Sequence, residues 1–167
     1  YNDVKTERQV LHIVRRIGTI GLSQMKERDW VDKGLYLQQG NEIALDIYHA
    51  MKRMVEPTFE HIDNNFEPID KAQADSFVGT SDRIVSFLAL CKKAIEENDE
   101  NNILIYNEGN NIIRNISNIK RDEMRHLRET SASKKADMVF HSILQESQNI
   151  VAFSINLLKV SNKFQKV

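Results

Sequence analysis

Residues that break helices or form turns are scarce in this sequence. Only 6 of its 167 residues are glycine and 2 are proline, which is less than half of the roughly 12% that proteins contain on average. Proteins built from β-sheets turn about every 8–12 residues, and they use glycine and proline in those turns. A β-sandwich, a β-barrel and a Rossmann fold are therefore nearly excluded, and the sequence predicts an all-α fold.

Cysteine and long apolar segments are scarce as well. A single cysteine, Cys91, cannot form a disulfide within the chain, and this favours a reducing compartment. The uncharged segment 147–158 near the C-terminus has 12 residues and includes serine, glutamine and asparagine, whereas a membrane span needs about 20 apolar residues. We expect no membrane span here, and because the sequence begins at Tyr1 we expect a longer parent protein.

Neither sign of charge is in excess. The chain has 23 lysine and arginine residues against 24 aspartate and glutamate residues, for a net charge of −1. Nucleic-acid-binding proteins carry a basic excess, so no nucleic-acid partner is expected. With 41% hydrophobic residues the chain is too apolar to be disordered, and its length suits a single domain over 1–167.

Helical periodicity, in contrast, extends through most of the chain. Apolar residues recur every three or four positions, as in helices that bury one face. Short polar connections at 96–100 and 130–133 favour antiparallel neighbours, so we expect an elongated, antiparallel up-and-down bundle of about five helices. Breaks are expected near 30–34 and at Pro57, since proline lacks a backbone donor and disfavours helix just before it.

Two carboxylates and a histidine share one predicted helix face. Glu42 and Asp46 are four residues apart, and His49 follows three residues after Asp46, which places all three on the same side of a helix. Paired carboxylates inside a helical bundle can hold a divalent metal, so these residues are a candidate metal site. A solvated polar face is the alternative interpretation.

The segment 54–70 is distinctive because it contains acids but no lysine or arginine. Its acidic residues are Glu56, Glu60, Asp63, Glu67 and Asp70. One interpretation is an ordered connection between helices, in which Asp63 or Asn64 caps a short turn. Phe59 and Phe66 would then close the end of the bundle. The other interpretation is a contact that responds to pH or to cations and includes His61.

A basic cluster lies along the fourth predicted helix and at its end. It consists of Lys120, Arg121, Arg125 and Arg128. Cations near a helix C-terminus complement the helix dipole, and this explanation needs no ligand. Alternatively, the cluster could lie against anionic lipids of the cytoplasmic leaflet, which attract each basic residue by roughly 1 kcal/mol.

Sequence motifs of common enzymes are absent. The chain contains no GxSxG, no P-loop and no GxGxxG, which are the motifs of nucleophilic catalysis and phosphate binding. Cys91 lies on an apolar stripe, as a buried structural thiol does. An enzyme is not expected. A histidine phosphotransfer domain remains an alternative, and the candidate phosphoryl acceptors are His49, His126 and His141.

Two short segments resemble a known family. The run 57–65 resembles a segment in the C-terminal soluble extension of inorganic phosphate transporters from Bacteroides-type bacteria, in the phosphate-permease (PiT) family. The run 154–159, followed by Phe164, resembles the end of those proteins, and 142–146 is similar in character. The order and spacing of the helices are similar from roughly Val10 to Phe164.

This resemblance implies a PhoU-like cytoplasmic domain, attached after the last membrane helices of a phosphate symporter at the inner membrane. It implies regulation rather than catalysis, with the transmembrane part of the same transporter and further copies of the chain as partners. PhoU proteins often carry Glu-x-x-x-Asp metal motifs, which Glu42 and Asp46 match by spacing. The regulatory candidates that the resemblance marks are Pro57, Phe59, Glu60, His61, Asp63, Asn64 and Asn65.

Overall fold

The computed structural model describes residues 27–99, 102–129 and 134–166, together with seven positions between 9 and 23, which are helical. The three long stretches form four α-helices and no strand. The helices are α2 (Glu27–Asp63), α3 (Lys71–Glu96), α4 (Ile103–Glu129) and α5 (Lys134–Lys166). The all-α prediction is confirmed for the described part of the chain, with four helices where the sequence predicted about five.

Helix α2 is continuous where the sequence predicted two breaks. It runs through 30–34 and through Pro57 to Asp63, so both predicted breaks are wrong. A glycine inside a helix costs only about 1 kcal/mol relative to alanine, and Gly34 is buried, so packing can offset that cost. At Pro57 the backbone carbonyl that loses its helical partner, that of Arg53, receives a hydrogen bond from α5 instead.

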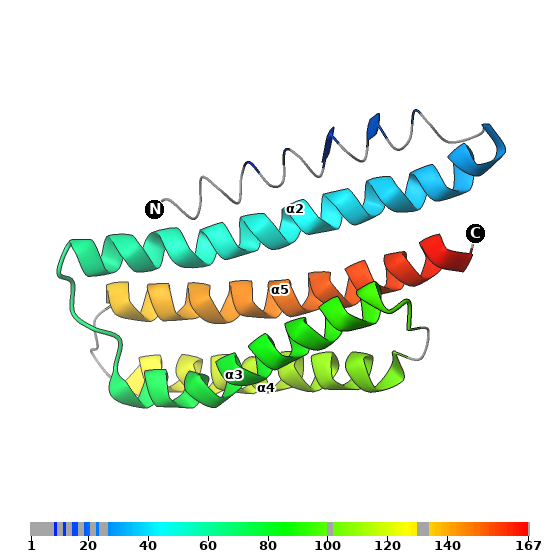
Figure 1. Ribbon diagram of the computed structural model, residues 1–167. Helices are drawn as coiled ribbons and strands as arrows, with labels where there is room; N and C mark the ends of the chain where they lie inside the picture. Colours follow the sequence, from blue (N-terminus) through cyan, green and yellow to red (C-terminus); the bar gives the residue numbers. More distant parts are fainter. Residues whose placement is uncertain are drawn as a thin grey trace.

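Helix α5 is the central element of the bundle (Figure 1). It contacts α2 on one side and α3 and α4 on the other, and α3 and α4 also contact each other. Within the described residues α2 contacts no helix other than α5. The chain direction alternates from α2 to α5, so that the end of α2 lies beside the start of α5.

The apolar core lies between α3, α4 and α5. Its buried side chains are Ile84, Phe87, Cys91, Ala94, Ile112, Ile116, Phe140, Leu144, Val151, Ile155 and Leu158. None of the described α2 side chains belongs to this cluster. Burial of each large apolar side chain contributes about 1.5–3 kcal/mol, so this cluster is a major source of apolar stabilisation among the described residues. Cys91 is buried as predicted, and burial raises the pKa of its thiol to about 11.

Gly109 allows α4 to approach both neighbouring core helices closely. A Cβ atom at this position would lie 2.8 Å from Cδ1 of Ile155 on α5 and 2.9 Å from the ring of Phe87 on α3. Both of those side chains are buried, and interiors are packed with few voids into which they could move. This glycine is therefore required by packing rather than by a turn.

Asparagine, not glycine, ends both α2 and α3. Asn65 and Asn98 have positive φ angles of 50° and 55°, in the left-handed region that asparagine tolerates. After α2, the amide of Phe66 donates to the carbonyl of His61 at 3.2 Å, and the amide of Asn65 donates to that of Ile62 at 3.0 Å. These bonds satisfy carbonyls that a helix end leaves free, which explains why α2 stops here and not at its proline.

Candidate functional site

A pocket of about 350 Å³ lies between the end of α2 and the start of α5. Its volume falls in the usual range for small-molecule sites, roughly 300–1,000 Å³. This α2–α5 pocket is lined by Pro57, Glu60, His61, Phe66, Lys135, Met138, Val139 and Ser142. Three of these residues, Pro57, Glu60 and His61, belong to the segment 57–65 that was singled out from the sequence.

His61 is the buried polar group of the pocket, with 6% of its surface exposed. Its Nε2 lies 2.6 Å from the carbonyl oxygen of Glu67, and because a carbonyl only accepts hydrogen bonds, Nε2 carries the proton. The ring also contacts Phe66, with ring centroids 5.6 Å apart. These two contacts fold the connection after α2 back onto the helix end, and they hold the imidazole in place.

Lys135 links the first turn of α5 to the same connection. Its ammonium lies 3.8 Å from the centroid of the Phe66 ring, which is the geometry of a cation–π contact. Within the described residues neither Lys135 nor Glu60 forms an ion pair. The pocket therefore holds one cationic and one anionic side chain that are not neutralised by a neighbour.

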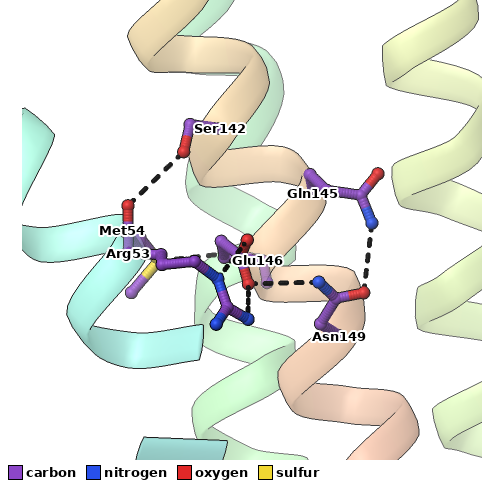
Figure 2. A network of polar contacts seen from close by, with 7 residues as sticks. Arg53, Met54, Ser142, Gln145, Glu146 and Asn149 are labelled. Carbon is purple, nitrogen blue, oxygen red and sulfur yellow. Dashed lines mark hydrogen bonds and ion pairs between the residues drawn. The ribbon is translucent and has the colours of Figure 1, made fainter. Parts of the chain in front are cut away.

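Ser142 on α5 donates a hydrogen bond to a backbone carbonyl of α2 that Pro57 leaves without a donor. A proline has no N–H to donate to the carbonyl four residues earlier, which in α2 is the carbonyl of Arg53. The hydroxyl of Ser142 on α5 donates to this carbonyl at 3.4 Å (Figure 2). The hydrogen bond that the proline removes from the helix is thus replaced by one between helices.

An ion pair fastens α2 to α5 next to the pocket (Figure 2). Nε and Nη2 of Arg53 each donate to a carboxylate oxygen of Glu146 at 2.9 Å, and Asn149 donates to the same carboxylate at 3.1 Å. The Arg53 guanidinium holds the pKa of Glu146 below its usual value, and Asn149 acts in the same direction. We call Arg53, Ser142, Glu146 and Asn149 the polar clasp.

Hydrogen bonds continue from the polar clasp across α5 to α4. Gln145 donates to Asn149 at 3.1 Å, and the ammonium of Lys120 on α4 donates to Gln145. Lys120 also donates to Gln148 at 3.4 Å, and Gln148 donates to Ser117 at 3.2 Å. Polar contacts thus connect α2 with α4 through α5, although α2 and α4 do not touch.

A second pocket, of about 280 Å³, is formed by the same part of α2. It is lined by Met54, Val55, Thr58, Phe59, Ile62 and Ile143. Phe59 is 55% exposed and Phe66 is 38% exposed, so the prediction that these two rings close the end of the bundle is wrong. Because α2 continues through Pro57, Phe59 stays on a helix and lines a surface pocket.

The remaining residues of the singled-out segment form the end of α2. Nδ2 of Asn64 donates to the carbonyl of Glu60 at 2.7 Å, so Asn64 caps a turn as predicted, and Asn65 takes the positive φ described above. Asp63 is the last helical residue and is exposed. These three residues therefore act through the shape of the chain, whereas Pro57, Glu60 and His61 line the pocket.

Glu42, Asp46 and His49 lie on one exposed face of α2. The carboxylate of Glu42 accepts a hydrogen bond from Gln38 at 3.1 Å. In the part of the chain that the structure describes, no three aspartate, glutamate, histidine or cysteine side chains come together in a group that could hold a metal ion. The helical spacing thus brings the three residues to one face without assembling them into a metal site.

The residues of the predicted basic cluster have separate environments. Lys120 binds glutamines of α5, Arg125 lies 3.5 Å from the carboxylate of Asp122, and Arg121 is exposed. The side chain of Arg128 lies outside the described residues, as does that of His126. The two other candidate phosphoryl acceptors, His49 and His141, are exposed on α2 and α5.

Sequence reasoning missed Arg53 and Lys135 as parts of this region. The one signal for Arg53 was its position four residues before Pro57, since this proline leaves the Arg53 carbonyl free for a neighbouring helix. Lys135 gave no signal, because its partner Phe66 lies far from it in the sequence.

No protein-family model, curated protein or solved structure matches the chain. None of the described helices is long and apolar enough to cross a membrane.

Proposed function

We propose that this chain is a non-catalytic regulatory domain of an inorganic phosphate transporter, with a PhoU-like helical arrangement. In this proposal it lies at the cytoplasmic face of the inner membrane. Its partners are the transmembrane part of the same transporter and further copies of the chain. The resemblance of the segments 57–65 and 154–159 supports the choice of transporter, and the four-helix arrangement is compatible with it.

The observation that carries the regulatory part of the proposal is the way in which α2 is attached. No described side chain of α2 belongs to the apolar cluster between α3, α4 and α5, although Ala50 is completely buried, and the helix is held on α5 partly by the polar clasp. Regulation requires two conformations with different affinities for a partner. The contact between α2 and α5 is extensive, but part of it consists of directional bonds that depend on charge, so a change of charge state can weaken it more readily than it can weaken an apolar core.

The test is a measurement of phosphate uptake. Cells that lack the region encoding this chain are compared with unmodified cells for uptake of radiolabelled phosphate, during phosphate starvation and during phosphate excess. We expect the difference in uptake between the two conditions to shrink when the domain is removed. Unchanged uptake in both conditions would contradict the proposal, as would a parent gene whose remaining sequence encodes no apolar spans of about 20 residues.

A matched pair of variants tests the role of α2 without removing the domain. Arg53→Met breaks the clasp, whereas Arg83→Met breaks an equally short ion pair, between Arg83 and Glu108 on α3 and α4. We expect only Arg53→Met to change the response of uptake to phosphate supply. Equal effects of the two variants would show that the attachment of α2 has no special role.

A further inference from the structure

The two sides of the α2–α5 pocket carry opposite charge. Glu60 and His61 line the pocket from α2, and Lys135, whose ammonium lies over the Phe66 ring, lines it from α5. Both Glu60 and Lys135 are exposed, so a ligand that enters from solvent can reach their charges. Within the described residues, Glu60 and Lys135 have no ion-pair partner. A single ligand that bears both a positive and a negative group can therefore satisfy both walls at once.

His61 adds a second acceptor to the α2 wall. Its Nε2 carries the proton that is donated to the carbonyl of Glu67, so in the neutral ring Nδ1 has a free lone pair. Among the described residues no contact uses Nδ1. His61 lines the pocket, so a ligand with a donor group can supply a hydrogen bond to Nδ1.

Between these charged groups the lining is apolar. Pro57, Phe66, Met138 and Val139 contribute side chains without charge. The volume of about 350 Å³ corresponds to roughly a dozen non-hydrogen atoms if each takes the space of one water, about 30 Å³. Lys135 is held close to the Phe66 ring, so its ammonium stands at the edge of this apolar surface.

We propose that the α2–α5 pocket binds a free α-amino acid with an apolar side chain, such as phenylalanine or methionine. The carboxylate of the ligand pairs with Lys135. Its ammonium is held by the carboxylate of Glu60 and by Nδ1 of His61, and its side chain lies on Phe66 and Met138. The ligand joins α2 to α5 and so stabilises the attached position of α2. This inference does not depend on the assignment to phosphate transport.

The charge pattern argues against two simpler ligands. A small anion such as inorganic phosphate would pair with Lys135 but would meet the carboxylate of Glu60 in the same pocket, where like charges repel. An apolar molecule without charge would gain nothing from either charged side chain, both of which are exposed to solvent. A ligand with both charges can pair with Glu60 and Lys135 together.

The first experiment compares three ligands that share one apolar body. Phenylalanine, hydrocinnamate (which lacks the ammonium) and phenethylamine (which lacks the carboxylate) are titrated into the chain by calorimetry, with inorganic phosphate as a fourth ligand. We expect phenylalanine to bind at least about tenfold more tightly than either single-charge analogue, since phenethylamine loses the bond to Lys135 and hydrocinnamate loses those to Glu60 and His61. Inorganic phosphate should not compete with it.

The second experiment assigns each charge to its residue. Lys135→Gln should weaken the binding of phenylalanine and of hydrocinnamate by about tenfold and leave the binding of phenethylamine unchanged. Glu60→Gln should weaken the binding of phenylalanine and of phenethylamine but not that of hydrocinnamate. The matched controls are Lys52→Gln and Glu56→Gln, which remove an exposed ion pair on α2 outside the pocket. Neither control should change any affinity.

Several results would overturn this inference. One is the absence of phenylalanine binding up to about 10 mM, ten times a millimolar dissociation constant. Another is equal affinity for all three ligands, which would indicate a purely apolar pocket. Binding of hydrocinnamate as tight as that of phenylalanine would indicate a site for organic anions. If Lys52→Gln or Glu56→Gln abolished the preference for phenylalanine over its single-charge analogues, the ligand would bind outside the α2–α5 pocket. Because no step measures phosphate uptake, failure here leaves the proposed function untouched.

Discussion

The two sides of α5 hold their neighbours by different means. Toward α3 and α4, α5 presents apolar side chains such as Leu144, Val151 and Leu158, which are completely buried. Toward α2 it presents polar groups, among them Ser142 and Glu146, next to apolar side chains such as Ile143 and Leu157. Apolar burial acts without direction and scales with area, whereas hydrogen bonds depend on geometry and charge state. One helix can therefore belong to a stable core and still support a neighbour whose attachment is adjustable.

The largest change in the free energy of unfolding is expected from a variant in the apolar core between α3, α4 and α5. Phe87 is completely buried among α3, α4 and α5, so Phe87→Ala should lower the free energy of unfolding by about 3–5 kcal/mol. Urea denaturation followed by circular dichroism measures this loss. The control is Val85→Ala on the same helix, where the side chain is 68% exposed and a change within about 0.5 kcal/mol is expected. Similar losses in both variants would mean that the core does not lie where the structure has it.

A smaller effect on the same side is expected at Gly109. Gly109→Ala introduces a Cβ atom that would lie within 3.0 Å of Phe87 and Ile155, and such overpacking costs about 1–3 kcal/mol. Gly79 on α3 is the matched control because nothing lies within 4 Å of its Cβ position. There the same substitution should stabilise the chain by about 0.5–1 kcal/mol, the difference in helix propensity. Thermal unfolding distinguishes the two signs.

A variant in the polar contacts between α2 and α5 is expected to affect α2 alone. Glu146→Gln removes the charge that binds Arg53 and should weaken the attachment of α2 by about 1–2 kcal/mol. The figure stays at this size because the Arg53 side chain is 52% exposed and solvent screens the pair. Amide hydrogen exchange should be faster in α2 and unchanged in α3. Equal acceleration in both helices would mean that α2 and the core form one cooperative unit.

The same ion pair gives α2 a dependence on pH. Arg53 lowers the pKa of Glu146 in the folded chain, so the carboxylate stabilises the fold at pH values above its ordinary pKa of about 4.3. That contribution is lost as the pH falls below this value and through the lowered pKa. Exchange from α2 amides, corrected for the intrinsic rate, should therefore increase only under acid conditions. In Glu146→Gln this contribution to the pH dependence should vanish.

The contacts of α5 with α3 and α4 could be predicted from the sequence to a large extent, and its polar contacts with α2 could not. The stripes that include Phe87, Ile112 and Leu144 follow from spacing alone, because a buried helix face repeats with the period of the helix. The break predicted at Pro57 followed the same local logic. In the structure the helix continues, and the carbonyl of Arg53 that Pro57 leaves without a donor receives a hydrogen bond from the hydroxyl of Ser142, 89 residues after Arg53.

The pocket shows the same division between local and distant information. Glu60 and His61 were singled out because their segment lacks basic residues, which is a local property of composition. Lys135 and Met138, on the opposite wall, come from a different helix. Their position depends on how α5 packs against α2, and no spacing within either helix contains that information.

The smallest expected effect concerns the two asparagines that end α2 and α3. Both have positive φ angles, and alanine in that region costs about 1 kcal/mol more than asparagine or glycine. Asn98→Ala, next to the core, should lower the global free energy of unfolding by this amount. Asn65→Ala should instead accelerate hydrogen exchange at the end of α2, with little change in global stability, since α2 lies outside the core. Glycine at position 65 should restore the original behaviour, whereas glycine at position 98 restores the backbone but not the hydrogen bond that Asn98 accepts from Gln165 at 2.6 Å. A global loss from Asn65→Ala equal to that from Asn98→Ala would contradict the separation between the two sides of α5.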